Sequence, residues 1–218
     1  MIEKREVHLA AAYSGLSLLV LFLILAVLVK LHSPIVGTID QFGFRLAESV
    51  TSPFGIEIAK MMTTFGGPIP NTIFAVVIAT IFWFWHKKDA SLTLLVSYFT
   101  GSVLALMAKL VIQRPRPVDP LQHNHGFSFP SGHMVTTTLL ILLVTVLLMR
   151  YMQHEALQVV LWMFALAWIL IIALSRVYLR AHYLTDIIGG GLFATGFVLL
   201  TVLFKPLVMH ELNDMRKK

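Results

Sequence analysis

Long apolar runs separated by short polar stretches dominate the chain. The first run, Leu9 to Val29, is uninterrupted. At about 1.5 Å per residue, a helix of this length crosses the ~30 Å hydrocarbon layer of a bilayer. Six such spans are predicted, at residues 9–29, 69–85, 91–112, 134–149, 157–174 and 187–208. The pattern therefore predicts an all-α, polytopic membrane protein that forms one transmembrane domain over residues 1–218.

The segment from Ser33 to Gly67 differs from the six spans. Prolines and glycines divide it into short pieces, within which apolar and charged residues alternate at helical spacing. The apolar positions are Ile39, Phe42, Leu46 and Val50, and the charged positions are Asp40, Arg45 and Glu48. This pattern is typical of short amphipathic helices that lie in the membrane interface. A plain connecting loop is the alternative.

Composition supports the membrane assignment. Hydrophobic residues make up 57% of the 218 positions and charged residues only 13%, whereas soluble domains carry about 25% charged residues. The chain has no cysteine, which excludes disulfides and thiolate-ligated metals. The first span is too long for the apolar core of a cleavable signal peptide.

The distribution of charge predicts an orientation in the membrane. The formal net charge is +6, but the basic residues are scattered between apolar spans, so we expect no nucleic-acid partner. Six spans place both termini on one side, and the Lys87-Lys88 turn and the basic C-terminal tail favour the cytoplasm for that side. The loops after spans one, three and five would then lie outside. Nothing in the pattern specifies an oligomeric state.

Three sets of polar residues stand at the outer ends of neighbouring spans. They are Lys109 with Arg116-Pro117, the tetrapeptide Pro130-Ser131-Gly132-His133, and Ser175-Arg176 with His182 and Asp186. Ionisable groups in such positions are expected to face a shared cavity rather than lipid.

The tetrapeptide has the features of an anion-binding helix start. Pro130 suits the entrance of a helix, Ser131 is a good N-cap, and Gly132 lets a ligand approach the backbone closely. The free N–H groups at such a start hold phosphate. The alternative is an ordinary capped helix with an incidental His133.

The other two sets add cations and a candidate nucleophile. Lys109, Arg116 and Arg176 are matched to phosphate oxygens, and Asp186 is almost the only carboxylate nearby, so we expect no metal and no cofactor. On a helix, His182 and Asp186 would share a face. The carboxylate would fix the imidazole tautomer and leave one nitrogen free to attack or to act as a base.

Each of these residues also has a simpler interpretation. Lys109 and Arg176 could anchor helices at the interface, and a His-x-x-x-Asp pair could be a surface contact. The presence of all three sets together favours a shared functional site over these simpler interpretations.

The three sets resemble the signature motifs of the type-2 phosphatidic acid phosphatase superfamily. The motifs are Lys109-x6-Arg116-Pro117, Pro130-Ser131-Gly132-His133 and Ser175-Arg176-x5-His182-x3-Asp186, and they cover residues 109–186. That superfamily includes membrane lipid phosphatases, glucose-6-phosphatase and the vanadium haloperoxidases.

The resemblance implies a role for each residue. His182 would be the nucleophile and form a phosphohistidine, Asp186 would orient it, and His133 would be the general acid. The phosphate oxygens would be bound by Lys109, Arg116, Arg176, Ser131 and the Gly132 amide. The resemblance implies no metal and no cofactor.

The predicted function is hydrolysis of a lipid phosphate or pyrophosphate at the outer face of a bacterial cytoplasmic membrane. Small size and resemblance to compact bacterial members suggest the bacterial setting. Undecaprenyl pyrophosphate, phosphatidylglycerophosphate and phosphatidate are candidate substrates. Two alternatives stay open: a lipid phosphotransferase that uses the same intermediate, and a transporter of anionic lipids with the same basic cavity.

Overall fold

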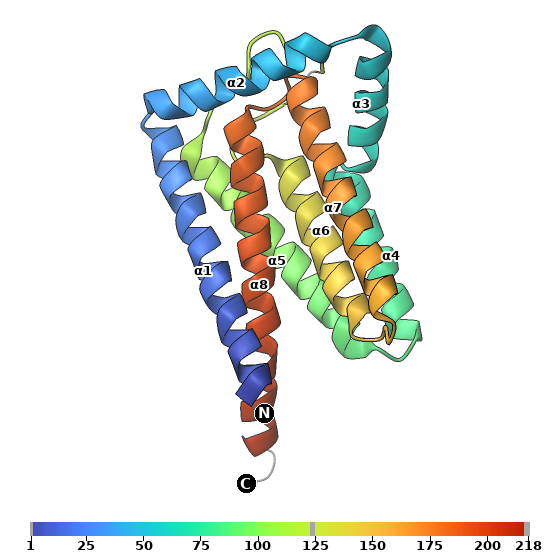
Figure 1. Ribbon diagram of the computed structural model, residues 1–218. Helices are drawn as coiled ribbons and strands as arrows, with labels where there is room; N and C mark the ends of the chain where they lie inside the picture. The colour runs from blue at the N-terminus through green and yellow to red at the C-terminus, as the bar shows by residue number, and fades with distance from the viewer. Residues whose placement is uncertain (1, 123–124, 216–218) are drawn as a thin grey trace.

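The computed structural model describes residues 2–122 and 125–215, with side chains described for residues 9–122 and 125–201. Within these ranges the chain forms eight helices and no strand, which confirms the all-α prediction (Figure 1). The helices are α1 (Ile2–Lys30), α2 (Pro34–Val50), α3 (Pro53–Phe65), α4 (Pro68–Phe84), α5 (Lys88–Ile112), α6 (Gly132–Met149), α7 (Glu155–Tyr178) and α8 (Leu184–Met215).

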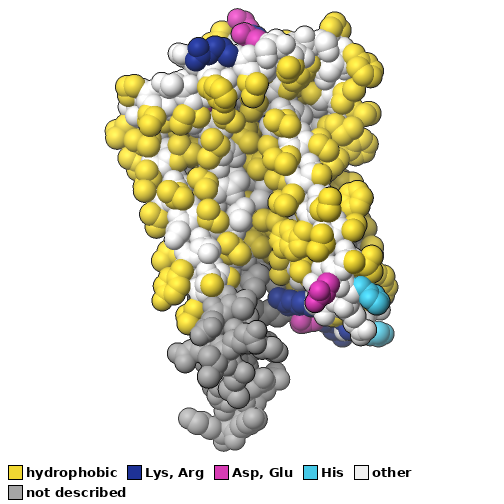
Figure 2. All heavy atoms as spheres, viewed as in Figure 1, with side chains coloured by type: hydrophobic (Ala, Val, Ile, Leu, Met, Phe, Trp, Pro, Cys, Tyr) yellow, Lys and Arg dark blue, Asp and Glu magenta, His cyan; other side chains and the backbone are white. Residues whose placement is uncertain are grey.

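Five helices of the described part are long and apolar enough to cross a membrane: α1, α5, α6, α7 and α8. Taken together, α3 and α4 are also long and apolar enough to cross a membrane, with a 43° bend between the two helices. Hydrophobic side chains cover most of the face shown in Figure 2, while charged side chains gather towards its two ends. The chain is a multi-pass membrane protein.

The segment between the first two spans is helical, but its two helices take different courses. Helix α2 lies across one end of the bundle, as expected for an interfacial helix, whereas α3 turns and runs beside α7 (Figure 1). The prolines that divide the sequence start these helices, because Pro34, Pro53 and Pro68 each occupy a first-turn position where a missing N–H costs nothing. Helices α3 and α4 thus follow one another as two bent parts of one apolar stretch.

Helix α2 buries a side that the amphipathic pattern does not predict. Asp40 lies among its buried residues, only 4% exposed, whereas Phe42 and Leu46 on the apolar side are more than half exposed. Gly43 allows the close approach to the start of α8, because a Cβ at this position would lie 2.8 Å from Cβ of Leu184. The charged face of α2 therefore points partly into the protein.

The helix ends that carry the three motifs meet beneath α2. These are the C-terminal ends of α5 and α7 and the first turns of α6 and α8, while the start of α1 and the end of α8 lie at the opposite end of the bundle (Figure 1). Helix α6 is the central helix: 61% of its spanning window is buried, against 22% for α5 and 17% for α7. The Pro-Ser-Gly-His stretch thus begins the most enclosed helix of the bundle.

Candidate active site

The third motif divides between two helices and a short connection. Ser175 and Arg176 lie in the last turn of α7, which continues beyond the predicted end of the span at Leu174, and Asp186 lies in the first turn of α8. His182 stands in the connection before α8. The expectation that His182 and Asp186 share a helical face is therefore wrong. The carboxylate instead reaches back from the start of α8.

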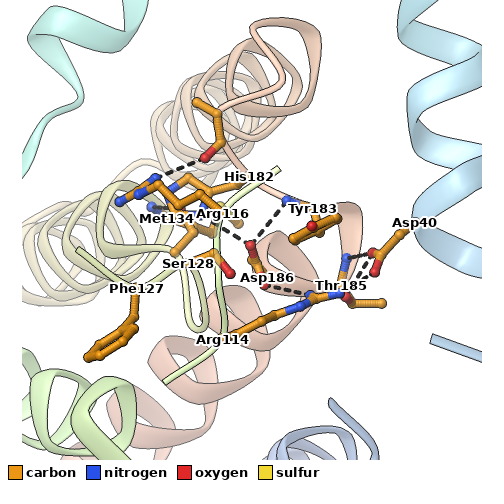
Figure 3. Close-up of polar contacts among 12 residues, drawn as sticks. Asp40, Arg114, Arg116, Phe127, Ser128, Met134, His182, Tyr183, Thr185 and Asp186 are labelled. Carbon is orange, nitrogen blue, oxygen red and sulfur yellow. Dashed lines mark hydrogen bonds and ion pairs between the residues drawn. The ribbon is translucent and has the colours of Figure 1, made fainter. Parts of the chain in front are cut away.

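His182 and Asp186 form a buried pair. Nδ1 of His182 lies 3.2 Å from Oδ2 of Asp186, which also accepts a hydrogen bond of 3.0 Å from the Tyr183 amide (Figure 3). His182 is 1% exposed and Asp186 is fully buried. A carboxylate can only accept, so this contact places the proton on Nδ1.

The other imidazole nitrogen faces a guanidinium. Nη1 of Arg116 lies 3.3 Å from Nε2 of His182. Because a guanidinium only donates, Nε2 acts as the acceptor and carries a lone pair. Burial lowers the pKa of His182 to about 4; the Asp186 contact opposes this shift, and Arg176 and Arg116 reinforce it. The imidazole is therefore neutral above about pH 4, with its free nitrogen directed at a cation.

Arg176 is fully buried and only partly paired. Its Nη1 donates to Oγ1 of Thr63 at 2.8 Å and to Oε1 of Gln122 at 3.0 Å. Its Nε and Nη2 have no hydrogen-bond partner in the part of the chain that the structure describes. Unsatisfied buried donors on a charged group are costly, and an oxyanion would satisfy both. Arg176 is thus the clearest sign of an anion site.

Lys109 and Arg116 hold the loop that precedes α6. Nζ of Lys109 donates to the Phe127 carbonyl at 2.8 Å and to the Ser128 carbonyl at 3.3 Å. Arg116 donates from Nε to the Gly126 carbonyl at 3.0 Å and from Nη1 to the Ala181 carbonyl at 2.8 Å. Burial lowers the pKa of Arg116, and Asp186 opposes this effect. Both cations therefore shape the wall of the site.

The start of α6 is capped as the sequence predicts. Oγ of Ser131 accepts from the Met134 amide at 3.4 Å, and the Ser131 amide donates to the Asp186 carbonyl at 3.1 Å. Gly132 is the first residue of the helix. The Ser131 hydroxyl proton remains available for a ligand, because its cap contact uses a lone pair.

His133 lies beside the bend between α3 and α4. A Cβ on Gly67 would stand 3.5 Å from its Nε2. His133 also lies within electrostatic range of Arg176, His182 and Arg116. The structure thus brings the predicted site residues to one end of the bundle: Lys109, Arg116, Ser131, Gly132, His133, Arg176, His182 and Asp186.

Sequence reasoning did not assign Thr63 and Arg114, which contact this group, or Asp40, which contacts Arg114. Thr63 on α3 binds Arg176. Arg114 donates from Nη1 to Oδ1 of Asp186 at 2.7 Å, and its Nη2 bonds to Asp40 on α2 (Figure 3). Two of them left a signal in the sequence: Asp40 is a lone aspartate on a helix that otherwise suits a membrane surface, and Arg114 is the first arginine of the Arg-Pro-Arg-Pro stretch.

The donor set suits phosphoryl transfer. A nucleophilic nitrogen, a second imidazole and three cations are what an in-line displacement at phosphorus requires from a protein. Among the described residues, no group of three His, Asp or Glu side chains is placed to hold a metal ion. Both Asp186 oxygens are already engaged by His182, Tyr183 and Arg114.

Comparison with known proteins identifies the family. The sequence model of the PAP2 superfamily matches residues 90–209, which include all three motifs. The chain belongs to the PAP2 superfamily. Phosphatidylglycerophosphatase B of Bacillus subtilis is 29% identical to it over 192 residues, covering 86% of this chain and 91% of that protein. Undecaprenyl-diphosphatase of Sulfolobus acidocaldarius is 24% identical over 201 residues, covering 85% and 88%.

Solved structures place this PAP2 protein in the membrane branch. The PAP2-type phosphatidylglycerolphosphate phosphatase from Bacillus subtilis superimposes with a TM-score of 0.79 at 27% identity, covering 90% of this chain and 98% of that one. Aquifex aeolicus LpxE gives a TM-score of 0.55 at 21% identity, covering 72% and 92%. The second likeness shows the fold alone.

The unpaired nitrogens of Arg176 predict a measurable effect on anion binding. Arg176→Lys keeps the charge but removes the fork, so we expect the orthovanadate concentration that half-saturates thermal stabilisation to rise about 10- to 100-fold, the equivalent of one or two charge-assisted hydrogen bonds. Arg150→Lys, at an exposed position at the opposite end of α6, is the control and should bind vanadate like the parent. Equal half-saturation for both variants would contradict the assignment of Arg176.

Proposed function

We propose that this membrane lipid phosphatase hydrolyses a lipid phosphate or pyrophosphate through a phosphohistidine on His182, at the external face of a bacterial cytoplasmic membrane. The observation that carries the proposal is the buried His182–Asp186 pair, whose Nδ1 to Oδ2 distance is 3.2 Å. It leaves Nε2 as a lone-pair nitrogen beside Arg116, 3.3 Å from Nη1. A neutral imidazole held in one tautomer is a nucleophile.

In the first step, Nε2 of His182 attacks phosphorus in line with the bond to the lipid. The N–P bond forms as the P–O bond breaks, and the departing oxygen keeps the electron pair and takes a proton from His133. Arg116, Arg176 and Lys109 stabilise the negative charge on the three equatorial oxygens. Asp186 stabilises the positive charge that develops on the His182 ring.

In the second step, water attacks the phosphohistidine. His133, now neutral, accepts a proton from the water, the P–N bond breaks, and its electron pair returns to Nε2 of His182. Inorganic phosphate leaves, and His133 is protonated again for the next cycle. One residue thus acts first as acid and then as base, as microscopic symmetry of the two steps requires.

Relatives guide the choice of substrate. Phosphatidylglycerophosphatase B covers nearly the whole chain at 29% identity, so phosphatidylglycerophosphate is our first candidate. The undecaprenyl-diphosphatase likeness, at 24% identity, supports undecaprenyl pyrophosphate as the second candidate. Phosphatidate is the third, because it offers the same terminal phosphate to the three cations. No metal enters this mechanism.

The principal test is phosphate release from a panel of these three lipids in mixed micelles. The parent protein should release inorganic phosphate and keep its rate in EDTA, because its charge stabilisation comes from arginine and lysine. His182→Asn should lower kcat by at least about 10³-fold, as loss of a covalent nucleophile does. Glu57→Gln is the control and should match the parent, since Glu57 is an exposed residue of α3.

Three outcomes would overturn the proposal or redirect it. Activity of His182→Asn near that of the parent would remove the catalytic assignment and favour a transporter of anionic lipids. Loss of activity in EDTA that Mg²⁺ restores would contradict the metal-independent mechanism. Transfer of the phosphoryl group to an added lipid alcohol, without free phosphate, would identify a phosphotransferase.

The lowered pKa of His182 predicts the acid limit of activity. Protonation of Nε2 removes the nucleophile, so kcat/KM should fall as pH drops through about 4, the pKa of His182, and not through the usual value of about 6.5. The ionisation of the lipid phosphate is measured by phosphorus NMR and divided out of the profile. An acid limb between pH 6 and 7 after this correction would contradict a buried, neutral His182.

The orientation can be tested because the chain has no natural cysteine. Val118 is 82% exposed in the loop of the site, and Lys88 is exposed at the other end of the bundle. In spheroplasts, we expect a membrane-impermeant maleimide to label Val118→Cys at once and Lys88→Cys only after permeabilisation. The reverse pattern would place the site in the cytoplasm.

A further inference from the structure

One group of buried charges lies behind the proposed nucleophile and outside the three motifs. Nη1 of Arg114 donates to Oδ1 of Asp186 at 2.7 Å, and Nη2 forms a hydrogen bond and an ion pair with Oδ2 of Asp40. The guanidinium also stacks on the ring of Tyr183, 3.9 Å from its centroid. Arg114 therefore bridges two carboxylates from different helices (Figure 3).

Asp40 is fixed as firmly as Arg114. Its Oδ1 accepts from the Thr185 amide at 3.0 Å and from the Thr185 hydroxyl at 2.8 Å. Asp40 thus caps the first turn of α8 from a separate helix. The capped residue, Thr185, directly precedes Asp186 in the sequence. An aspartate that is 4% exposed is costly unless it is fully paired. The Asp40 carboxylate is paired with Arg114, which binds Asp186, and with Thr185, which precedes Asp186.

Helix α2 has other attachments besides this buried pair. The far end of the helix has its own ties to the end of α7 and to the connection that follows it: the Tyr178 hydroxyl donates to the Val50 carbonyl at 3.1 Å, and Arg180 binds Glu48 at 2.5 Å. The Ser52 amide in turn donates to the Tyr178 hydroxyl at 2.9 Å. A buried charge on α2 therefore needs a further reason.

We propose that Asp40 and Arg114 are positioning residues that hold the Asp186 carboxylate in the orientation that His182 needs. Arg114 can form a two-pronged pair with a single carboxylate. Because Asp40 engages one of its nitrogens, Arg114 takes only Oδ1 of Asp186 and leaves Oδ2 for Nδ1 of His182. This inference rests on the proposed function of His182 as the nucleophile.

The arrangement makes the two residues depend on one another. Without Asp40, Arg114 is free to fork across both oxygens of Asp186 and compete with His182. Without Arg114, Asp40 and Asp186 are two buried carboxylates with no cation between them, which disfavours the ionised form of Asp186. Either loss weakens the orientation of His182 without touching Lys109 or Arg176, which bind the phosphate in the proposed mechanism.

The test compares kcat and KM for four variants in mixed micelles, with dioctanoyl phosphatidate or the preferred lipid of the panel as substrate. Asp40→Asn keeps the shape and the acceptor for Thr185 but removes the charge, and we expect kcat to fall at least tenfold with KM within threefold of the parent. Arg114→Gln should behave alike. The double variant should be no slower than Arg114→Gln alone, because both changes break one relay.

Glu48→Gln is the matched control, since it removes the other ion pair between α2 and its surroundings. Its kcat should stay within twofold of the parent. The inference is overturned if Asp40→Asn loses less than tenfold in kcat, raises KM more than threefold, multiplies with Arg114→Gln, or is matched by Glu48→Gln.

Two further measurements keep the result decisive. If Asp40→Asn does not give a folded protein, Arg114→Lys makes the same test, because an ammonium cannot bridge the two carboxylates as a fork does. It should lower kcat at least tenfold at unchanged KM. An active His182→Asn would defeat the proposed function, whereas an inactive His182→Asn beside a fully active Asp40→Asn would defeat only the positioning role.

Discussion

The Asp186 carboxylate and its backbone carbonyl join three segments of the chain. Oδ2 receives His182 and the Tyr183 amide, Oδ1 receives Arg114, and the carbonyl receives the amide of Ser131. The connection before α8, the loop after α5 and the start of α6 are thereby fixed relative to one another. Since the residue is fully buried, these contacts form at low dielectric, where charge-assisted hydrogen bonds are strong and an unpaired charge is costly.

Cations outnumber carboxylates around this centre, and the excess positive charge suits a phosphate ligand. Asp40 and Arg114 offset one another and Asp186 engages His182, whereas Lys109, Arg116 and Arg176 are close together with no further carboxylate bonded to them in the described part of the chain. Two nitrogens of Arg176 lack partners there. A phosphate dianion compensates this excess and makes the site complementary to a transferring phosphoryl group.

Local pattern predicts the bundle well because membrane helices are set by length and hydropathy. The helices that contain spans 91–112 and 134–149 start within a few residues of the expected positions, and the helix that contains span 9–29 starts earlier, at Ile2. The Ser131 cap is where the sequence places it. The course of α3 could not be predicted, because the break at Gly66-Gly67 separates it from α4 without fixing the angle between them, and its contact with α7 joins residues far apart in the sequence.

The contacts between Asp40, Arg114 and Asp186 could not be predicted from the sequence for a similar reason. These residues are far apart along the chain, and only the position of α2 across the bundle brings Asp40 to Arg114. The local pattern even gave the wrong environment for Asp40, since its spacing on α2 suits a solvated face. The geometry of His182 and Asp186 also needed the structure, because α8 begins between them.

The most direct test of the central claim is to trap the phosphoenzyme. The variant His133→Gln is treated with radiolabelled p-nitrophenyl phosphate. The p-nitrophenolate leaving group needs no proton, so the first step proceeds, but the variant lacks the base for the second step, and a phosphohistidine should accumulate. The account predicts an acid-labile, base-stable label that mass spectrometry locates on residue 182 and that is absent when His182→Asn is added. Turnover of the parent with no label in the trap variant, or a label on another residue, would contradict the account.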